Sequence, residues 1–156
     1  MYRKQGKFML FDLPAFADWL RDFSPRRRVW RVQNHHTFSP SYDDFNGSNH
    51  FAKLTGMEDY HVNTNHWSEI AQNLTTFPDG TVAVCRSFDK TPAGIVGANG
   101  GALCIENLGN FDLGGDAMTD EQRATILKLN ALLCRKYLLT PTTNSIVYHH
   151  WFAAKS

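Results

Sequence analysis

The stretch Val29-Trp30-Arg31-Val32-Gln33-Asn34-His35-His36 largely alternates apolar and polar side chains and then ends in two histidines. Alternation with a period of two predicts a half-buried strand over residues 29–35. A second run, Ile146-Val147-Tyr148, leads directly into His149-His150 and predicts another strand with the same ending. The sequence therefore predicts a sheet in which two strands stop at pairs of histidines.

The segments between these two strands predict further strands and a hairpin. Residues 70–77 and 81–86 are β-rich, and Pro78-Asp79-Gly80 joins them as a turn in which proline presets φ and glycine accepts a positive φ. Residues 102–108 are mostly apolar and predict a short strand, which the carboxylate of Glu106 interrupts.

Helices are expected in three places. Residues 13–23 carry apolar side chains at helical spacing, and residues 51–54 predict a short helix that Gly56 stops. Residues 119–122, Thr-Asp-Glu-Gln, form a capping box that opens the clearest helix of the chain, with Thr119 as its N-cap. Strands that alternate with helices, together with one hairpin, predict an α/β fold with a central mixed β-sheet flanked by helices.

Length and charge limit the function classes. A chain of 156 residues predicts a single domain, here residues 29–156, with an N-terminal helical segment over residues 1–28 packed on it. The net charge of +1 argues against a nucleic-acid or anionic-membrane binder, which would carry a basic excess. Hydrophobic residues make up 42% of the chain, enough for a packed core, but no apolar run approaches the ~20 residues that span a bilayer.

The cysteines and the N-terminus indicate the compartment. Cys85, Cys104 and Cys134 include no CxxC pair, so they predict neither a disulfide framework nor a zinc knuckle. The basic N-terminus lacks the apolar core and cleavage site of a secretory signal. We therefore expect a protein that is made in the cytoplasm without a signal peptide and that is monomeric.

The two histidine pairs suggest a metal site. The ends of neighbouring strands are rigid and open onto a groove, so they suit the imidazole ligands that zinc prefers. Adjacent residues of a strand face opposite sides, so we expect one histidine from His35-His36 and one from His149-His150 to face the metal. The alternative is that these are ordinary hydrogen-bonded histidines.

Two further residues are candidates for catalysis. Glu106 lies in an apolar run, where an unpaired carboxylate is costly to bury. It is a general base beside a metal, or else an edge residue or a partner for an arginine. Lys155 lies six residues after His149 and is either a cation that stabilises an oxyanion or a solvated side chain near the chain end.

Five motifs occur in an order that resembles one superfamily, the type-2 N-acetylmuramoyl-L-alanine amidases. These amidases share a fold with peptidoglycan recognition proteins and phage endolysins, and the resemblance covers residues 29–156. The motifs are Asn34-His35-His36-Thr37, Trp67-Ser68-Glu69-Ile70-Ala71-Gln72-Asn73, Phe77-Pro78-Asp79-Gly80, Cys104-Ile105-Glu106-Asn107-Leu108-Gly109-Asn110-Phe111 and Tyr148-His149-His150.

The resemblance implies a zinc (Zn²⁺) hydrolase that acts on peptidoglycan. Such an enzyme cuts the amide bond between the lactyl group of N-acetylmuramic acid and the L-alanine of the stem peptide. The family pattern implies His35 and His149 as metal ligands, Glu106 as the catalytic acid–base and Lys155 as the oxyanion-stabilising residue. The implied partners are the glycan strand and the stem peptide.

The chain departs from the family pattern at two positions. Recognition-type members often carry a tyrosine where this chain has Gln72, which cannot serve as a base. The family's third ligand, a cysteine or aspartate, would fall at position 157, and the sequence ends at Ser156. We expect truncation just before that ligand. The alternatives are a substitute ligand (His36, His150 or the carboxylate of Ser156) or a metal-poor, inactive domain.

The substrate groove is expected between the loops 37–49 and 91–101. Asn63, Asn65 and Asn99 are candidates for hydrogen bonds to sugar or peptide, and Trp67 for contact with a sugar ring. The alternatives are turn-forming asparagines and a buried core tryptophan.

Two other functions compete with the amidase. One is a non-catalytic peptidoglycan-binding recognition domain, which Gln72 and the missing third ligand favour. The other is a metallohydrolase that acts on a different amide. If the chain is an amidase without a signal peptide, a phage or prophage endolysin that acts on the cell wall fits better than a secreted autolysin, although an autolysin that is released is the alternative.

Overall fold

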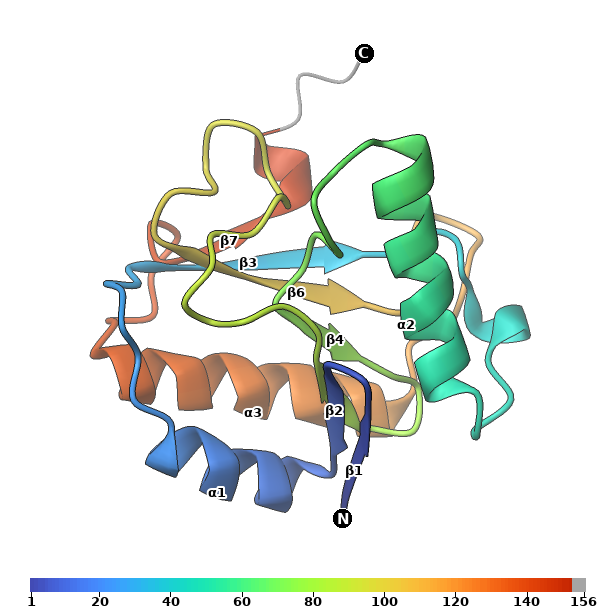
Figure 1. The fold of residues 1–156 in the computed structure, drawn as a ribbon, viewed down its shortest axis with the longest axis horizontal. Coiled ribbons are helices and arrows are strands. Elements are labelled where there is room, and N and C mark those ends of the chain that lie inside the picture. Colours follow the sequence, from blue (N-terminus) through green and yellow to red (C-terminus); the bar gives the residue numbers. More distant parts are fainter. Residues whose placement is uncertain (153–156) are drawn as a thin grey trace.

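The computed structural model describes residues 1–152, and its centre is a mixed sheet with the strand order β1-β2-β5-β4-β6-β3-β7 (Figure 1). The strands are β1 (Tyr2–Gln5), β2 (Phe8–Phe11), β3 (Arg31–His36), β4 (Leu74–Thr76), β5 (Val82–Val84), β6 (Ala102–Asn107) and β7 (Ile146–Tyr148). The α-helices are α1 (Leu13–Asp22), α2 (His50–Asp59) and α3 (Asp120–Tyr137). The α/β class with a central mixed sheet is therefore as predicted.

The half of the sheet that carries the histidines is parallel. Strand β6 pairs in parallel with β4 and β3, and β3 pairs in parallel with β7. In this register His35 lies opposite Glu106, and Asn34 lies opposite Tyr148. Because the carboxyl ends of parallel strands meet at one edge of the sheet, the residues that end or follow β3, β6 and β7 gather there.

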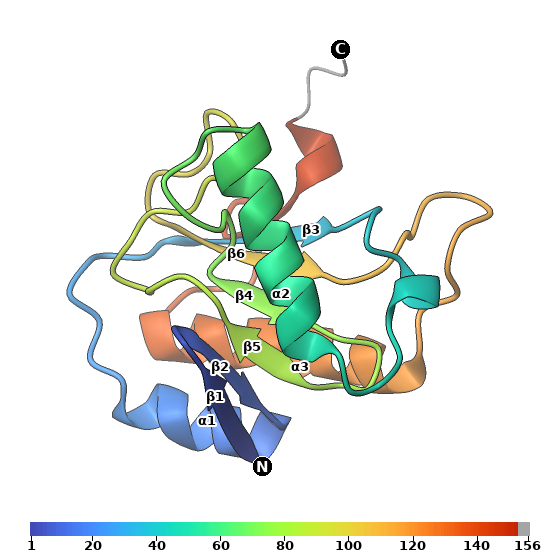
Figure 2. The same ribbon diagram turned by 45° about the vertical axis from the view of Figure 1, so that its right-hand side comes forward.

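Helices cover both faces of the sheet (Figures 1 and 2). On one face α1 and α3 lie together, and Leu129 and Leu133 of α3 pack with Leu103 and Ile105 of β6. On the other face, Leu54 and Met57 of α2 belong to a second core cluster. The residues of this second cluster are Phe8, Leu10, Leu54, Met57, Ile70, Phe77, Ala83, Cys85 and Leu108. Alternate residues of the central strands therefore pack into two different hydrophobic cores, one on each face of the sheet.

The start of α3 follows the predicted capping motif in part. The hydroxyl of Thr119 accepts a hydrogen bond from the backbone N–H of Gln122 at 3.1 Å, as an N-cap does. The side chain of Gln122, however, turns into the core, where its Nε2 donates to Thr76 Oγ1 at 3.1 Å and to the carbonyl of Leu108 at 3.0 Å. One half of the capping box therefore forms, and the other half ties α3 to the sheet.

The helix at residues 51–54 is longer than predicted. It runs from His50 to Asp59 and continues as a π-helical turn, Tyr60–Thr64. Gly56 does not stop it, because this glycine faces open space while Leu54 and Met57 are buried against the sheet. Burial of that apolar stripe outweighs the low helix propensity of one glycine, which is about 1 kcal/mol.

The N-terminal segment holds more than the expected helix. Residues 1–28 contain α1, and they also contain β1 and β2, which form an antiparallel hairpin. Strand β2 pairs with β5 through Met9, Leu10 and Phe11, so the segment is continuous with the central sheet. The predicted strand over 70–77 is shorter than expected, since only Leu74–Thr76 pair with neighbouring strands.

Two predictions drawn from composition can be compared with the structure. Within residues 1–152, no helix is long and apolar enough to cross a membrane. The three cysteines are buried and free, so the expectation that they form no disulfide framework holds.

Candidate functional site

The structure brings His35 and His149 together at the carboxyl edge of the sheet. His35 is near the end of β3, and His149 follows β7 at the start of a short 3₁₀ turn, His149–Trp151. Their ring centroids lie 4.4 Å apart, with an angle of 27° between the ring planes. A zinc–nitrogen bond is about 2.0–2.1 Å long, so the two nitrogens that bind one zinc ion lie at most about 4.2 Å apart. The ring nitrogens lie away from the centroids, so rings at this separation are close enough for one nitrogen of each to bind the same metal.

The other member of each histidine pair makes different contacts. The Nδ1 atom of His36 accepts a hydrogen bond from the backbone N–H of Phe111 at 3.1 Å, and its Nε2 lies 3.6 Å from Asp112. The ring of His150 packs near Tyr148 and Trp151, with centroid distances of 6.0 and 5.9 Å. The structure thus distinguishes His35 and His149, which face each other, from His36 and His150.

Both facing imidazoles are neutral at pH 7. Burial, together with smaller contributions from the nearby imidazoles of His149 and His36, lowers the pKa of His35 to about 4. Burial also lowers the pKa of His149, with smaller contributions from His36 and His150. Neutral imidazole is the form that binds a metal, because protonation occupies the lone pair.

Glu106 lies on the strand next to His35 and lines a cavity of about 640 Å³. Its side chain is half-buried, and burial raises its pKa from 4.5 to about 8. Other residues of this cavity come from the loop after β3 and from α2 with its π turn. They are Thr37, Phe38, Ser39, Pro40, Asp44, Lys53, Gly56, Met57, Tyr60 and His61. A carboxyl group whose pKa is near neutrality is suited to general acid–base chemistry.

A second cavity, of about 680 Å³, contains both His35 and His149. Its walls come from β3, the loop after β6, α3 and the end of β7. The remaining lining residues are Asn34, His36, Asn107, Phe111, Asp112, Met118, Arg123, Ile126, Leu127, Tyr148 and His150. The two cavities have no lining residue in common, and both lie around the ends of β3 and β6, where Glu106 lines one of them and Asn107 lines the other.

The predicted substrate contacts lie in different surroundings. Trp67 is 39% exposed, and its ring stacks on His61 at 5.0 Å, so it is not a buried core residue. Asn63 is exposed and Asn65 is half-buried at the π turn. The Oδ1 of Asn99 accepts from the backbone N–H groups of Gly94 and Ile95, both at 2.9 Å. The acceptor of Asn99 is therefore engaged within its own loop, as the turn-forming alternative expects.

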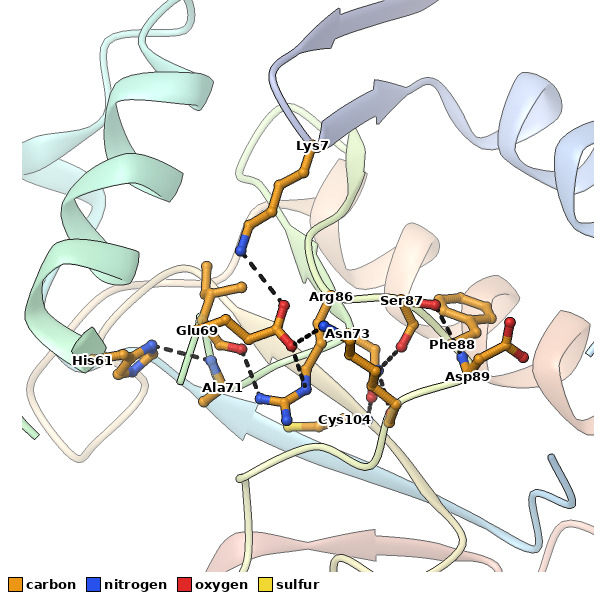
Figure 3. A network of polar contacts seen from close by, with 12 residues as sticks. Lys7, His61, Glu69, Ala71, Asn73, Arg86, Ser87, Phe88, Asp89 and Cys104 are labelled. Carbon is orange, nitrogen blue, oxygen red and sulfur yellow. Dashed lines mark hydrogen bonds and ion pairs between the residues drawn. The ribbon is translucent and has the colours of Figure 1, made fainter. Parts of the chain in front are cut away.

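The motif Trp67–Asn73 is largely structural in this chain. Glu69 lies 2.7 Å from Lys90 Nζ, 3.7 Å from Arg86 Nε and 3.6 Å from Lys7 Nζ, as Figure 3 shows in part. Burial alone would raise the pKa of Glu69, but these three cations bring it below its usual value. This ion-pair network joins the N-terminal hairpin to the loops on both sides of β4 and β5.

Asn73 and Gln72 complete this structural motif. Asn73 Oδ1 accepts from the backbone N–H of Cys104 at 3.0 Å, and its Nδ2 donates to the carbonyls of Ser87 and Lys90 (Figure 3). Gln72 is fully buried and donates to Thr75 Oγ1 at 3.1 Å. Gln72 therefore cannot replace the tyrosine that recognition-type relatives often carry, because its side chain does not reach the groove.

The described residues supply only part of a metal-ligand set. Within residues 1–152, no group of three or more His, Cys, Asp and Glu side chains could hold a metal ion. His35 and His149 are thus two donors, whereas catalytic zinc normally takes three protein ligands. Lys155, expected to stabilise an oxyanion, and Ser156, one substitute ligand, lie outside the described residues.

Sequence reasoning missed the helical wall of the Glu106 cavity. Lys53, Tyr60 and His61 line that cavity from α2 and the π turn. A helix predicted to stop at Gly56 could not place the last two of them. The available signal was the buried stripe at i, i+4 and i+7, formed by His50, Leu54 and Met57, which continues beyond the glycine.

Comparisons with known proteins agree on the fold. A family model for N-acetylmuramoyl-L-alanine amidases matches residues 25–156. No curated protein matches the chain. Bumblebee PGRP-SA is 21% identical, with 86% of this chain and 81% of that one covered and a TM-score of 0.68.

Two further solved structures are similar in the same way. The endolysin N-acetylmuramoyl-L-alanine amidase LysCS from Clostridium intestinale is 20% identical, with 82% and 73% of the two chains covered and a TM-score of 0.65. Human PGRP-IBETAC in complex with glycosamyl muramyl pentapeptide is 17% identical, with 84% and 77% covered and a TM-score of 0.69. At these identities the likeness shows a shared fold, and the predicted resemblance is confirmed by the family match.

Proposed function

The chain belongs to the N-acetylmuramoyl-L-alanine amidase family, and on that premise we propose that it hydrolyses the amide between N-acetylmuramic acid and L-alanine in peptidoglycan with the help of zinc. The observation that carries the proposal is the pair of facing imidazoles, His35 and His149, beside a strand that presents Glu106. We further propose that the chain acts on the cell wall as a monomer, in the manner of an endolysin.

The two histidines are ligands of the kind that zinc prefers, and a catalytic zinc site normally has a third protein ligand. His35 and His149 are neutral at pH 7 and would hold the ion, and the family pattern implies a third ligand two residues after Lys155. When bound, zinc supplies a Lewis acid that polarises the scissile carbonyl group. Lys155 would add a positive charge near the developing oxyanion.

In this proposal Glu106 transfers a proton from the attacking water to the leaving amine. Its carboxylate accepts a proton from the attacking water at an Oε atom and then delivers that proton to the nitrogen of the departing L-alanine. Burial raises the pKa of Glu106 to about 8 in the metal-free protein, and a bound cation would act in the opposite direction, toward neutrality, where a carboxyl group can both accept and donate a proton. General acid–base catalysis of this kind contributes roughly 10²–10⁴ in rate.

The two cavities suit a branched substrate. The bond that is cut joins a sugar to a peptide, so the two halves of the substrate must diverge from the cleavage point. The Glu106 cavity and the histidine cavity lie around the ends of β3 and β6 and are lined by different residues, so they offer separate sites for the two halves. The human relative bound to glycosamyl muramyl pentapeptide supports a ligand that contains both halves.

The test measures cleavage and zinc binding separately. We expect Glu106→Ala to retain zinc and to release L-alanine-linked peptide from purified muropeptides at least about 100-fold more slowly. Glu121→Ala, at an exposed carboxylate on α3, is the matched control. Cleavage by Glu106→Ala at the parent rate would remove Glu106 from the mechanism.

A second experiment tests the metal. We expect a version extended by Cys-Pro-Gly to bind zinc more tightly than the present chain and to cleave muropeptides faster. Equal metal content and equal activity of the two versions would contradict a ligand at position 157.

The alternative function is a peptidoglycan-binding domain without catalysis. The burial of Gln72 and the two-donor metal set favour it. Muropeptide binding by calorimetry, without cleavage in the presence of added zinc by either version of the chain, would support this alternative.

A further inference from the structure

Two polar atoms beneath the loop 91–101 are buried and have no hydrogen-bond partner among the described residues. They are Oε1 of Gln33 and Nε2 of His35. The two residues are separated by one position on β3, so their side chains lie on the same face of the sheet. Buried polar atoms in proteins are almost always paired, so two adjacent unpaired ones require an explanation.

Gly94 shows how close these two atoms are. A Cβ atom added to Gly94 would lie 2.5 Å from Gln33 Oε1, 2.7 Å from Cys104 Sγ and 3.1 Å from His35 Nε2. All three side-chain atoms therefore border one small space directly under the backbone of the loop. Only glycine leaves that space open, because any other side chain would fill it.

The orientation of the Gln33 amide is fixed by its other end. Its Nε2 donates to the carbonyl of Ala98 at 2.8 Å and to Asn99 Oδ1 at 3.3 Å. The amide nitrogen must therefore face the loop, and the oxygen faces the space that it shares with His35. A flipped amide would place the oxygen against the carbonyl of Ala98, where neither atom can donate.

We propose that Gln33 is a positioning residue that accepts the Nε2–H of His35, directly after a small rotation or through one water molecule. This contact selects the imidazole tautomer whose Nδ1 carries the lone pair, so that Nδ1 is the nitrogen presented to a metal. Hydrogen bonds from outer partners orient metal-binding histidines in this way. The inference rests on the proposed function for its purpose, but the tautomer itself is a property of the metal-free protein.

The enclosure of Nε2 supports this assignment. Nε2 of His35 is closed off from solvent by Gln33, Cys104 and Gly94, and within residues 1–152 no set of three donors surrounds it. The thiol of Cys104 is the competing partner. If Cys104 donated to Nε2, the proton of the imidazole would be on Nδ1 and the opposite tautomer would result.

The experiment determines the tautomer in the zinc-free protein. Long-range ¹H–¹⁵N spectra of ¹⁵N-histidine-labelled protein distinguish a protonated Nε2 from a protonated Nδ1, with His35→Gln used to assign the signals. We expect a protonated Nε2 in the parent protein. In Gln33→Met, which removes the acceptor at similar volume, we expect a mixture of tautomers.

Asn99→Ala is the matched control, because it loosens the loop without removing the Gln33 oxygen. We expect it to keep the parent tautomer. Zinc affinity, measured by chelator competition, should fall about 10–100-fold in Gln33→Met and stay near the parent value in Asn99→Ala. A protonated Nδ1 in the parent protein, or an unchanged tautomer in Gln33→Met, would overturn the proposal. These spectra do not depend on activity, so an inactive chain would count against the proposed function alone.

Discussion

Replacing Glu106 by glutamine should change how the stability of the zinc-free protein depends on pH. The folded protein raises the pKa of Glu106 from 4.5 to about 8 through burial. The folded state therefore binds this proton more tightly than the unfolded state does. The contribution of protonated Glu106 to the free energy of unfolding is fully present below pH 4.5 and is lost as the pH rises through about 8. Glutamine is neutral throughout and lacks this dependence.

The magnitude follows from the size of the shift. One pKa unit corresponds to about 1.36 kcal/mol, so a fully enclosed carboxyl group with this shift would lose about 5 kcal/mol across the window. Glu106 is half-buried and borders a cavity, so water screens part of the charge. We therefore expect the free energy of unfolding of the parent protein, relative to Glu106→Gln, to fall by about 2–3 kcal/mol between pH 5 and pH 9.

Urea denaturation in the presence of a chelator, at several pH values between about 5 and 9, measures this difference. The histidines of the site titrate in both proteins, so their contributions cancel in the comparison. Glu121→Gln, at an exposed carboxylate, is the control and should parallel the parent protein. A stability difference between the parent and Glu106→Gln that stays constant over this range would show that burial does not perturb Glu106.

Three further predictions concern single contacts. His35→Ala should weaken zinc binding, measured by chelator competition, by more than about 100-fold, which exceeds the effect of removing a residue that only hydrogen-bonds to a ligand. His150→Ala should leave zinc affinity near the parent value. Equal losses in the two variants would mean that His35, whose ring faces His149, is not a ligand. Asn130→Ala should lower the free energy of unfolding by about 2 kcal/mol, because it leaves the buried amide of Asn34 without the two hydrogen bonds of 3.0 and 3.1 Å that join β3 to α3. The double variant with Asn34→Ala should then lose less than the sum of the two single changes, and strict additivity would argue against a coupled pair. Thr119→Ala should lower stability by about 1 kcal/mol through loss of the N-cap of α3, and Thr119→Ser should restore most of it; an unchanged urea midpoint in Thr119→Ala would show that the cap contributes nothing.

The parts of the fold that the sequence predicts are those with strong local signals. The strand that ends at His36, the hairpin turn at Asp79-Gly80 and the cap at Thr119 each depend on a few neighbouring residues. The N-terminal hairpin has no such signal. All four residues of β1 are exposed, so the strand shows no apolar alternation, and it is a strand only because β2 pairs with it.

The residues of the candidate site likewise include some that the sequence predicts and one that it does not. The histidine pairs and Glu106 are visible because polar residues at the ends of apolar strands are unusual. The contribution of Gln33 is not visible, because it arises from the loop 91–101 folding back over β3 and placing Gly94 against His35. Such a contact between distant segments depends on tertiary structure, which a periodicity in one segment cannot report.

Strand register explains why His35, and not His36, is suited to the site. His35 and His36 are chemically identical, but β3 is parallel to β6 in a register that sets His35 opposite Glu106 and His36 opposite Asn107. A slip of one residue would exchange the two faces of β3. It would move Gln33 away from the loop and break the amide pair that joins Asn34 to α3. The paired amides of Asn34 and Asn130 therefore do more than stabilise the core, because they fix which imidazole meets His149.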